Sequence, residues 1–296
     1  IYQQLAKVRK ENSALNEGSM RFVYASAEAI VYAREDGKQT VVVCVTRGRD
    51  DEIMIPKDAI PNLAKATNIF GGGEISVEGR LVDASNATLF VSITDGSSTT
   101  NAIYKPIAGE RPLWDFPDGN LASRERAAYL VDRALGFNHI PVTILRDGPF
   151  GMGMVQQWID VDEDVDLEVF FRKDDPQLRQ VALLDAVINN TDRKIGHLLP
   201  SKDGHLYICD HGVTFHSDDK LRTVLWQWAG VPFTAEEITA LRKLADEIDG
   251  ELSDELHSLI TGDEISALKS RIDNLLKSAS FPHPNPEWPH IPWPPF

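Results

Sequence analysis

The chain has 296 residues, 42% of them hydrophobic and 25% charged, which is enough for one large or two medium domains with hydrophobic cores. The formal net charge is −15 and no basic run stands out, so nucleic acid is not an expected partner, since polyanion binding needs clustered Lys and Arg. No apolar run approaches the ~20 residues of a transmembrane helix, and Cys44 and Cys209 are expected to be free thiols in a reducing cytoplasm.

Residues 1–70 are predicted to form a helix followed by a small antiparallel β unit. Leu5 and Val8 mark the apolar face of the helix, which ends near Gly18. The strand-like runs that follow are 21–24, 29–35 and 39–46. The Asp36-Gly37 pair between the last two runs is typical of a hairpin turn.

The stretch YQQLAKVRKENSAL and the strands after it resemble the end of an α-amylase-family glycoside hydrolase, over residues 1–56. In that family a last barrel helix runs into an antiparallel C-terminal β domain. The family's catalytic carboxylates lie in the barrel, which the matching stretch does not include. The resemblance therefore implies a structural appendage and no glycosidase activity.

A Gly71-Gly72-Gly73 triplet predicts the boundary to a β-rich unit over residues 71–159. No Lys-Ser or Lys-Thr pair follows at the spacing of a P-loop, so a linker is favoured over a phosphate loop. The expected strands are 74–82, 87–93, 100–107, 141–147 and 153–159, with a helix over 122–135 between the third and the fourth.

Residues 160–296 are predicted to be mainly helical. After an acidic connector, the helix 178–190 presents Val181, Leu184 and Ile188 on one face. A short β-hairpin follows. Two further helices are expected, one begun by Thr234 in a capping box and one by Asp263. The last residues, FPHPNPEWPHIPWPPF, are expected to pack along their own domain.

Four charged residues in this order suit phosphoryl transfer, which depends mainly on positioning and on charge neutralisation. Lys105, on the third strand of the β-rich unit, could reach the phosphates of ATP, and Glu125 on the next helix could hold its ammonium group. Asp192, where a helix becomes a loop, suits a group that orients or deprotonates a hydroxyl. Asp210, at the end of a strand, suits a Mg²⁺ ligand. We predict that all four converge on one cleft.

Three further residues extend the predicted site. Ser85 and Asn86, in the turn between the first two strands of the β-rich unit, could cover phosphates with a hydroxyl and backbone N–H groups. His197 could contact a second metal position or the phosphates. The expected cofactors are ATP and Mg²⁺, and the expected acceptor is an unidentified hydroxyl-bearing molecule.

The motifs YKP, RERAAY, NNTDRKIGHLL and CDHG, with PLWDFP and DKLRTVLWQWAG, resemble the phosphatidylinositol 3-/4-kinase-like superfamily over residues 73–230. The nearest resemblance is to its bacterial, actinobacterial-type branch. It implies an α+β class with a bilobal kinase-like fold, a β-rich N-lobe before a helical C-lobe. It also implies that Lys105 binds ATP, that Asp192 is catalytic and that Asp210 is a metal ligand. The hinge near adenine would be Gln157, Trp158 and Ile159.

The chain departs from the superfamily pattern at three positions. His197 stands where Asn is the usual second metal ligand, Lys194 stands where His is frequent, and His211 replaces the Phe of Asp-Phe-Gly. Histidine can bind a metal, although Mg²⁺ prefers oxygen.

Other functions use the same residues. A nucleotide-binding pseudokinase would bind ATP without turnover and act as an interaction module, and an AMP transferase would transfer AMP instead of phosphate. The cluster His197, His205, His211 and His216 suggests a transition-metal hydrolase, but no His-Glu-x-x-His or paired-Cys spacing supports it. The sequence does not indicate an oligomeric state.

Overall fold

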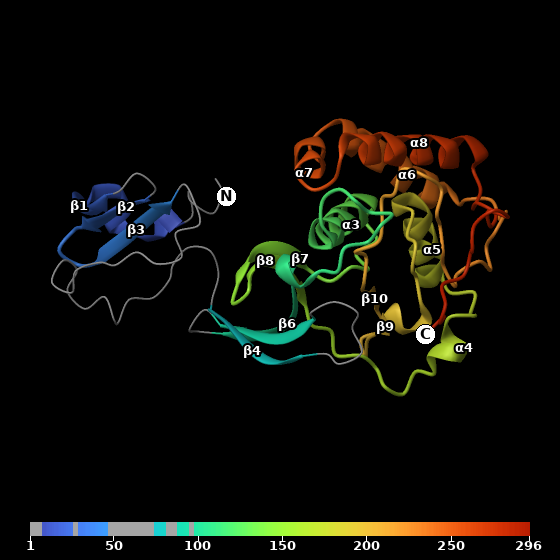
Figure 1. Ribbon diagram of the computed structural model, residues 1–296, viewed down its shortest axis with the longest axis horizontal. Coiled ribbons are helices and arrows are strands. Elements are labelled where there is room, and N and C mark those ends of the chain that lie inside the picture. The colour runs from blue at the N-terminus through green and yellow to red at the C-terminus, as the bar shows by residue number, and fades with distance from the viewer. Residues whose placement is uncertain (1–7, 26–28, 47–73, 81–87, 95–97) are drawn as a thin grey trace. The chain divides into compact units, whose positions relative to one another are not determined.

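The computed structural model describes residues 8–25, 29–46, 74–80, 88–94 and 98–296 (Figure 1). The chain divides into two compact units, residues 1–74 with 94–99, and residues 75–93 with 100–296. The predicted phosphate-covering turn at Ser85 and Asn86 lies outside the described residues, as do Leu5 and the predicted glycine boundary 71–73.

The first unit contains a short helix and a three-stranded antiparallel sheet, as predicted. They are α2 (Ser13–Glu17), β1 (Ser19–Ala25), β2 (Ala29–Glu35) and β3 (Thr40–Thr46). Asp36 stabilises the predicted hairpin turn because its carboxylate accepts hydrogen bonds from the backbone N–H groups of Lys38 and Gln39, at 2.9 and 3.0 Å. Val31 and Ala33 alternate along β2 and are fully buried.

The second unit begins with a sheet of five strands in the order β4-β5-β6-β8-β7. The strands are β4 (Glu74–Arg80), β5 (Leu89–Thr94), β6 (Thr99–Pro106), β7 (Thr143–Gly148) and β8 (Gly151–Gln157). Lys105 of β6 is paired with Met154 of β8 in antiparallel register. A Cβ at the adjacent Gly153 would lie 2.6 Å from both the Lys105 carbonyl oxygen and the Tyr104 ring, so glycine permits this close strand contact.

Helix α3 (Leu121–Leu135) connects β6 to β7 through the loop that carries the 3₁₀ helix η2 (Ile107–Gly109). Asn120 caps its start by accepting from the Ser123 N–H at 2.7 Å, and the Glu110 carboxylate accepts from the N–H groups of Leu121 and Ala122, at 2.8 Å each. The helix ends at Gly136, whose φ is 80°. Ala127 and Val131 join the core of the helical part that follows, so α3 is fixed against it.

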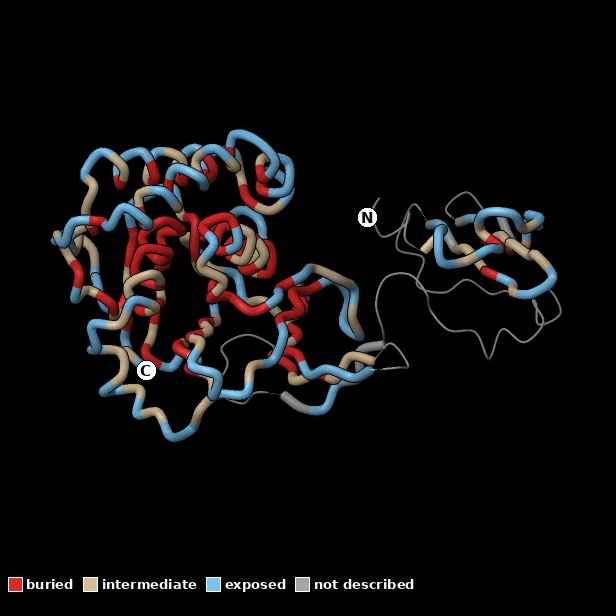
Figure 2. Tube along the Cα trace, turned by 180° about the vertical axis from the view of Figure 1, so that it is seen from behind, coloured by how far each residue is buried: buried red, intermediate tan, exposed pale blue. Residues whose placement is uncertain are grey.

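The remainder is mainly helical, as predicted, with α5 at its centre (Figures 1 and 2). The elements are α4 (Leu167–Phe170), α5 (Pro176–Ile188), η3 (Ile195–His197), β9 (Leu198–Pro200), β10 (Leu206–Ile208), α6 (Ala235–Asp249), α7 (Ser253–His257) and α8 (Gly262–Ser278). Every residue from 181 to 191 is buried. The predicted capping box of Thr234 and Glu237 is confirmed.

The prediction that Asp263 caps the last helix is wrong. Thr261 is the N-cap and forms a capping box with Glu264, which leaves Asp263 in the first turn. The expectation for the C-terminal residues is confirmed, since His290 and Pro295 carbonyl oxygens accept from the backbone N–H groups of Thr223 and Ile195 at 3.1 and 2.8 Å.

The expected fold class is confirmed: an α+β protein in which a β-rich lobe precedes a helical lobe, after a small helix and antiparallel sheet. Within the described ranges, none of the helices combines the length and the apolar character needed to cross a bilayer.

Candidate active site

The Lys105 ammonium group lies between two carboxylates from distant parts of the chain. Its Nζ is 2.7 Å from Glu125 Oε1 on α3 and 3.0 Å from Asp210 Oδ1, which follows β10. The Glu125 side chain is 2% exposed, whereas that of Asp210 is 51% exposed. The inner carboxylate therefore fixes the lysine, and the outer one is open to a ligand. The structure brings these three predicted residues together.

The charges of this group stabilise one another. Burial disfavours the ammonium form of Lys105, but Asp210 and Glu125 hold its pKa above the usual range. Burial alone would raise the pKa of Glu125, yet the neighbouring Lys105 lowers it to about 2. The Lys105 charge also holds the pKa of Asp210 far below its ordinary value. All three side chains are thus ionised at neutral pH.

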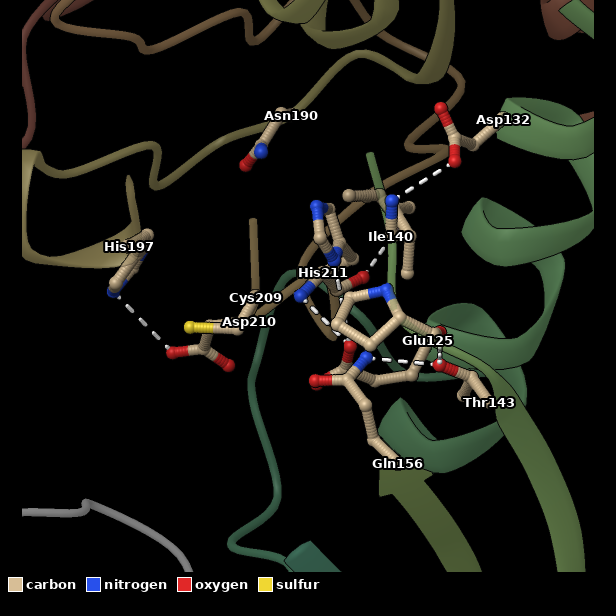
Figure 3. A network of polar contacts seen from close by, with 12 residues as sticks. Glu125, Asp132, Ile140, Thr143, Gln156, Asn190, His197, Cys209, Asp210 and His211 are labelled. Atoms are coloured by element: carbon tan, nitrogen blue, oxygen red, sulfur yellow. Dashed lines mark hydrogen bonds and ion pairs between the residues drawn. The ribbon is translucent and has the colours of Figure 1, made fainter. Parts of the chain in front are cut away.

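Asp210 is presented to this group by an unusual backbone conformation. Its φ is 63°, in the left-handed region that is uncommon for residues other than glycine but is tolerated by aspartate. The next residue is held in place, because the backbone N–H of His211 donates to Glu125 Oε2 at 3.0 Å (Figure 3). The same glutamate therefore contacts the lysine and the backbone beside Asp210.

His197 faces the other oxygen of Asp210, with Nε2 3.6 Å from Oδ2 (Figure 3). Burial lowers the pKa of His197 to about 4, so the ring is neutral at pH 7. Its Nδ1 accepts from the Lys194 N–H at 3.4 Å, which leaves the ring proton on Nε2, toward Asp210. Binding a metal through Nε2 would require this proton to leave.

The donor set is compatible with Mg²⁺. The described part of the chain contains no group of three or more His, Cys, Asp and Glu side chains arranged to hold a metal ion. Mg²⁺, however, is commonly bound by one or two carboxylates, with phosphate oxygens and water completing the coordination. The half-exposed Asp210 carboxylate is of the chemical type that Mg²⁺ prefers, whereas the nitrogen of His197 suits Mg²⁺ less well than oxygen would.

Asp192, the predicted catalytic carboxylate, lies in the loop between α5 and η3 and is held by two cations. Its Oδ1 is 3.3 Å from Arg222 Nη2, and its Oδ2 is 3.4 Å from Lys194 Nζ. Burial raises the pKa of Asp192, although Lys194 opposes the shift; the charge of Asp210 raises the pKa further. Among the described residues, no hydrogen bond or ion pair joins Asp192 to Lys105, Glu125 or Asp210, so its convergence with them stays a prediction.

The predicted hinge residues follow the end of β8. The backbone N–H of Gln157 donates to Val142 O at 2.9 Å, and that of Trp158 donates to Asn101 O at 3.0 Å. Both N–H groups already donate hydrogen bonds within the β-rich lobe. A backbone hydrogen bond to adenine would therefore have to involve the N–H of Ile159 or a carbonyl oxygen. The Trp158 indole packs edge-on against Phe90, with ring centroids 4.9 Å apart.

A buried network that no sequence pattern predicted lies beside this site. Arg193 is fully buried, and its Nε and Nη2 donate to the Asp185 carboxylate at 3.0–3.2 Å. Asn190 and Thr223 donate to the same carboxylate, at 2.9 and 3.1 Å. The signal was the aspartate within the apolar run LLDAV of α5, because a buried carboxylate needs a cation and hydrogen-bond donors.

No family model matches the chain. Protein Rv2133c of Mycobacterium tuberculosis is 43% identical over 263 residues, which cover 77% of this chain and 94% of that protein. Phosphatidylinositol 4-kinase gamma 4 of Oryza sativa subsp. japonica is 24% identical over 316 residues, which cover 83% of this chain. The chain spans 54% of the rice protein's length. The rice relative agrees with the resemblance to phosphatidylinositol kinases that the motifs indicate.

The solved structures that are similar to the chain include two kinases. A Helicobacter pylori proinflammatory kinase, CtkA, has 13% identity and a TM-score of 0.43, covering 71% of this chain and 93% of that one. The golgi casein kinase has 15% identity and a TM-score of 0.39, covering 70% and 71%. The relatives do not test the likeness of residues 1–56 to an amylase domain, which stays a prediction. Identity of 43% over most of both proteins shows that the chain belongs to the family of protein Rv2133c.

Proposed function

We propose that the chain is an ATP- and Mg²⁺-dependent phosphotransferase that acts on a hydroxyl-bearing acceptor. The observation that carries the proposal is the Lys105 ammonium held between the buried Glu125 and the exposed Asp210. A fixed cation beside an accessible carboxylate is what a triphosphate and its metal ion require. The similarity to a rice phosphatidylinositol 4-kinase supports the same class of reaction.

Lys105 would bind phosphate oxygens of ATP, and the ionised Glu125 would keep its ammonium group in place. Asp210 would hold Mg²⁺, and His197 stays a predicted second ligand that now faces the same carboxylate. The metal ion, when bound, neutralises charge on the phosphates. Gln157, Trp158 and Ile159 would form the edge of the adenine site. Ser85 and Asn86 stay predicted phosphate-covering residues.

Asp192 would orient the acceptor hydroxyl and accept its proton on a carboxylate oxygen. The hydroxyl oxygen would bond to the γ-phosphorus of ATP while the bond from that phosphorus to the β–γ bridging oxygen breaks, so that ADP leaves. Lys194 and Arg222 each contact one carboxylate oxygen of Asp192, and each of these oxygens keeps a second lone pair that can accept from the hydroxyl. Burial raises the pKa of Asp192, which makes it a stronger base than an exposed aspartate.

The acceptor that fits best is a small molecule or a protein hydroxyl. A net charge of −15 disfavours nucleic acid and counts against an anionic membrane surface. ATP is abundant in the cytoplasm, where we place the reaction. We also propose the predicted division of the chain into three parts, residues 1–70, 71–159 and 160–296.

Nucleotide binding without turnover is the second candidate function. It is favoured by one observation: His197 stands at the predicted second metal position, where its ring nitrogen suits Mg²⁺ less well than the usual asparagine oxygen. A protein of this kind would bind Mg²⁺-ATP through the same lysine and carboxylates and would present its surface to a partner.

The test is an acceptor screen with ATP labelled on the γ- or on the α-phosphate, with Asp192→Asn as the matched control. The phosphotransferase is expected to transfer the γ-label, and the control is expected to lose this transfer while still binding Mg²⁺-ATP. Transfer of the α-label would instead show an AMP transferase. Binding of Mg²⁺-ATP that is equal in both proteins, with no transfer of either label to any acceptor, would support the second candidate.

A further inference from the structure

The side chain of His211 is fully buried between the site's glutamate and the network beneath it. Its Nε2 is 2.8 Å from Arg193 Nη2, and its Nδ1 is 3.6 Å from Glu125 Oε2. Figure 3 shows His211 beside Glu125 and directly after Asp210. The ring therefore contacts a residue of α3 on one side and a residue of the Asp192 loop on the other.

The chemistry of Arg193 determines the state of this ring. A guanidinium group can only donate hydrogen bonds, so Nε2 of His211 has to be the acceptor. The ring is then neutral and carries its proton on Nδ1, which faces Glu125 Oε2 at 3.6 Å without forming a hydrogen bond. Burial, which lowers the pKa of His211, favours the same neutral form.

Arg193 is itself held in place by other contacts, so its hydrogen bond fixes the position of the His211 ring. It forms an ion pair with Asp185 of α5 at 3.0 Å, and its Nη1 donates to the carbonyl oxygen of Cys209 at 2.9 Å. Arg193 thus holds both residues that flank Asp210, through the backbone of Cys209 and the side chain of His211. Asp210 between them keeps its left-handed φ of 63°.

We propose that His211 is a positioning residue: its ring accepts from Arg193 and its backbone N–H donates to Glu125, and together these bonds hold Asp210 in the conformation that faces Lys105, where a metal-nucleotide complex would bind. This inference rests on the proposed binding of Mg²⁺-ATP. Without the acceptor at Nε2, the backbone at Asp210 is free to leave the left-handed region, and the binding-competent fraction falls.

The test uses two substitutions of nearly the same shape. In His211→Gln the side-chain amide oxygen can still accept a hydrogen bond from Arg193. In His211→Met the group at this place is a thioether sulfur, which is only a weak acceptor. Affinity for ATP is measured by calorimetry with Mg²⁺ and, separately, with EDTA. The unfolding temperature without nucleotide is measured in parallel, to separate a general loss of stability from a loss of position.

The wild-type protein is expected to bind Mg²⁺-ATP more tightly than metal-free ATP. His211→Met is expected to lose about 5- to 30-fold in affinity for Mg²⁺-ATP with little change in metal-free binding, and His211→Gln is expected to stay within about 3-fold of wild type. A folded His211→Met variant with wild-type affinity for Mg²⁺-ATP would overturn the inference, as would equal losses in both variants. No Mg²⁺-ATP binding by the wild type would instead refute the proposed function.

Discussion

The ion pair of Lys105 and Glu125 makes a pH-dependent prediction for Lys105→Met. This substitution keeps most of the side-chain length but leaves the Glu125 carboxylate, 2% exposed, without its cation. Burial opposes ionisation of Glu125, yet Lys105, with a smaller contribution from His211, lowers its pKa from 4.5 to about 2, and a net shift of this size corresponds to about 3 kcal/mol of stability. Breaking a buried ion pair by removing one partner typically costs about 3–5 kcal/mol. Both lines of reasoning predict a loss of about 3 kcal/mol at pH 7.

The sign of the pH dependence follows from the two forms of Glu125. In the wild type its depressed pKa contributes stability that is present above pH 4.5 and is lost as pH falls toward 2. In Lys105→Met, burial raises the pKa of the same carboxyl. The free-energy cost of the unpaired, buried carboxylate is therefore present at pH 7 and disappears once the group is protonated. The difference in stability between the two proteins is therefore expected to shrink as pH falls from 7 to 4.

Urea unfolding at pH 7, 5.5 and 4 measures this difference. Lys243→Met is the control, since Lys243 forms an exposed pair with Glu247 and its loss is expected to cost less than about 0.5 kcal/mol at every pH. If Lys105→Met were destabilised equally at pH 7 and pH 4, the ion pair would not be the source of the stability, and the reasoning would be refuted.

Three further predictions concern the supports of the site. Asp185→Asn removes the countercharge of the buried Arg193 and is expected to destabilise the protein by about 3–5 kcal/mol in urea unfolding. Gly153→Ala is expected to cost about 1–3 kcal/mol, because the new methyl group meets β6, whereas Gly262→Ala, with open space around it, is expected to be neutral. Asp192→Asn is expected to slow turnover by about 10²–10⁴-fold in a γ-label assay while Mg²⁺-ATP affinity stays within about 3-fold. Unchanged turnover would show that Asp192 is not catalytic. Wild-type stability of Asp185→Asn would contradict the role given to its ion pair with Arg193, and wild-type stability of Gly153→Ala would contradict the need for glycine beside β6.

The convergence of Lys105, Glu125 and Asp210 could be predicted because each lies at a recognisable place in a strand or helix. The order of strands, helix and loops then limits where the three can meet. Their roles stay predictions. The turn of Ser85 and Asn86 lies outside the described residues.

The supports of the site could not be predicted, because they depend on contacts between segments that no local pattern encodes. The bond between Arg193 and His211 joins two loops that meet only after α5 and the β9–β10 hairpin have packed. The pair of Arg222 and Asp192 depends in the same way on the path of the chain after His211. The wrong cap at Asp263 has a local cause, since the reciprocal bonds of Thr261 and Glu264 start the helix two residues earlier.

The most direct test of the central claim is a calorimetric titration of Mg²⁺-ATP into the wild-type protein and into Asp210→Asn. Saturable binding by the wild type is expected, with affinity reduced at least about 10-fold in the variant, since the amide cannot supply the charge of the carboxylate to the metal ion. Equal affinity in both proteins, or no binding by the wild type, would contradict the assignment of Lys105, Glu125 and Asp210 as a Mg²⁺-ATP site.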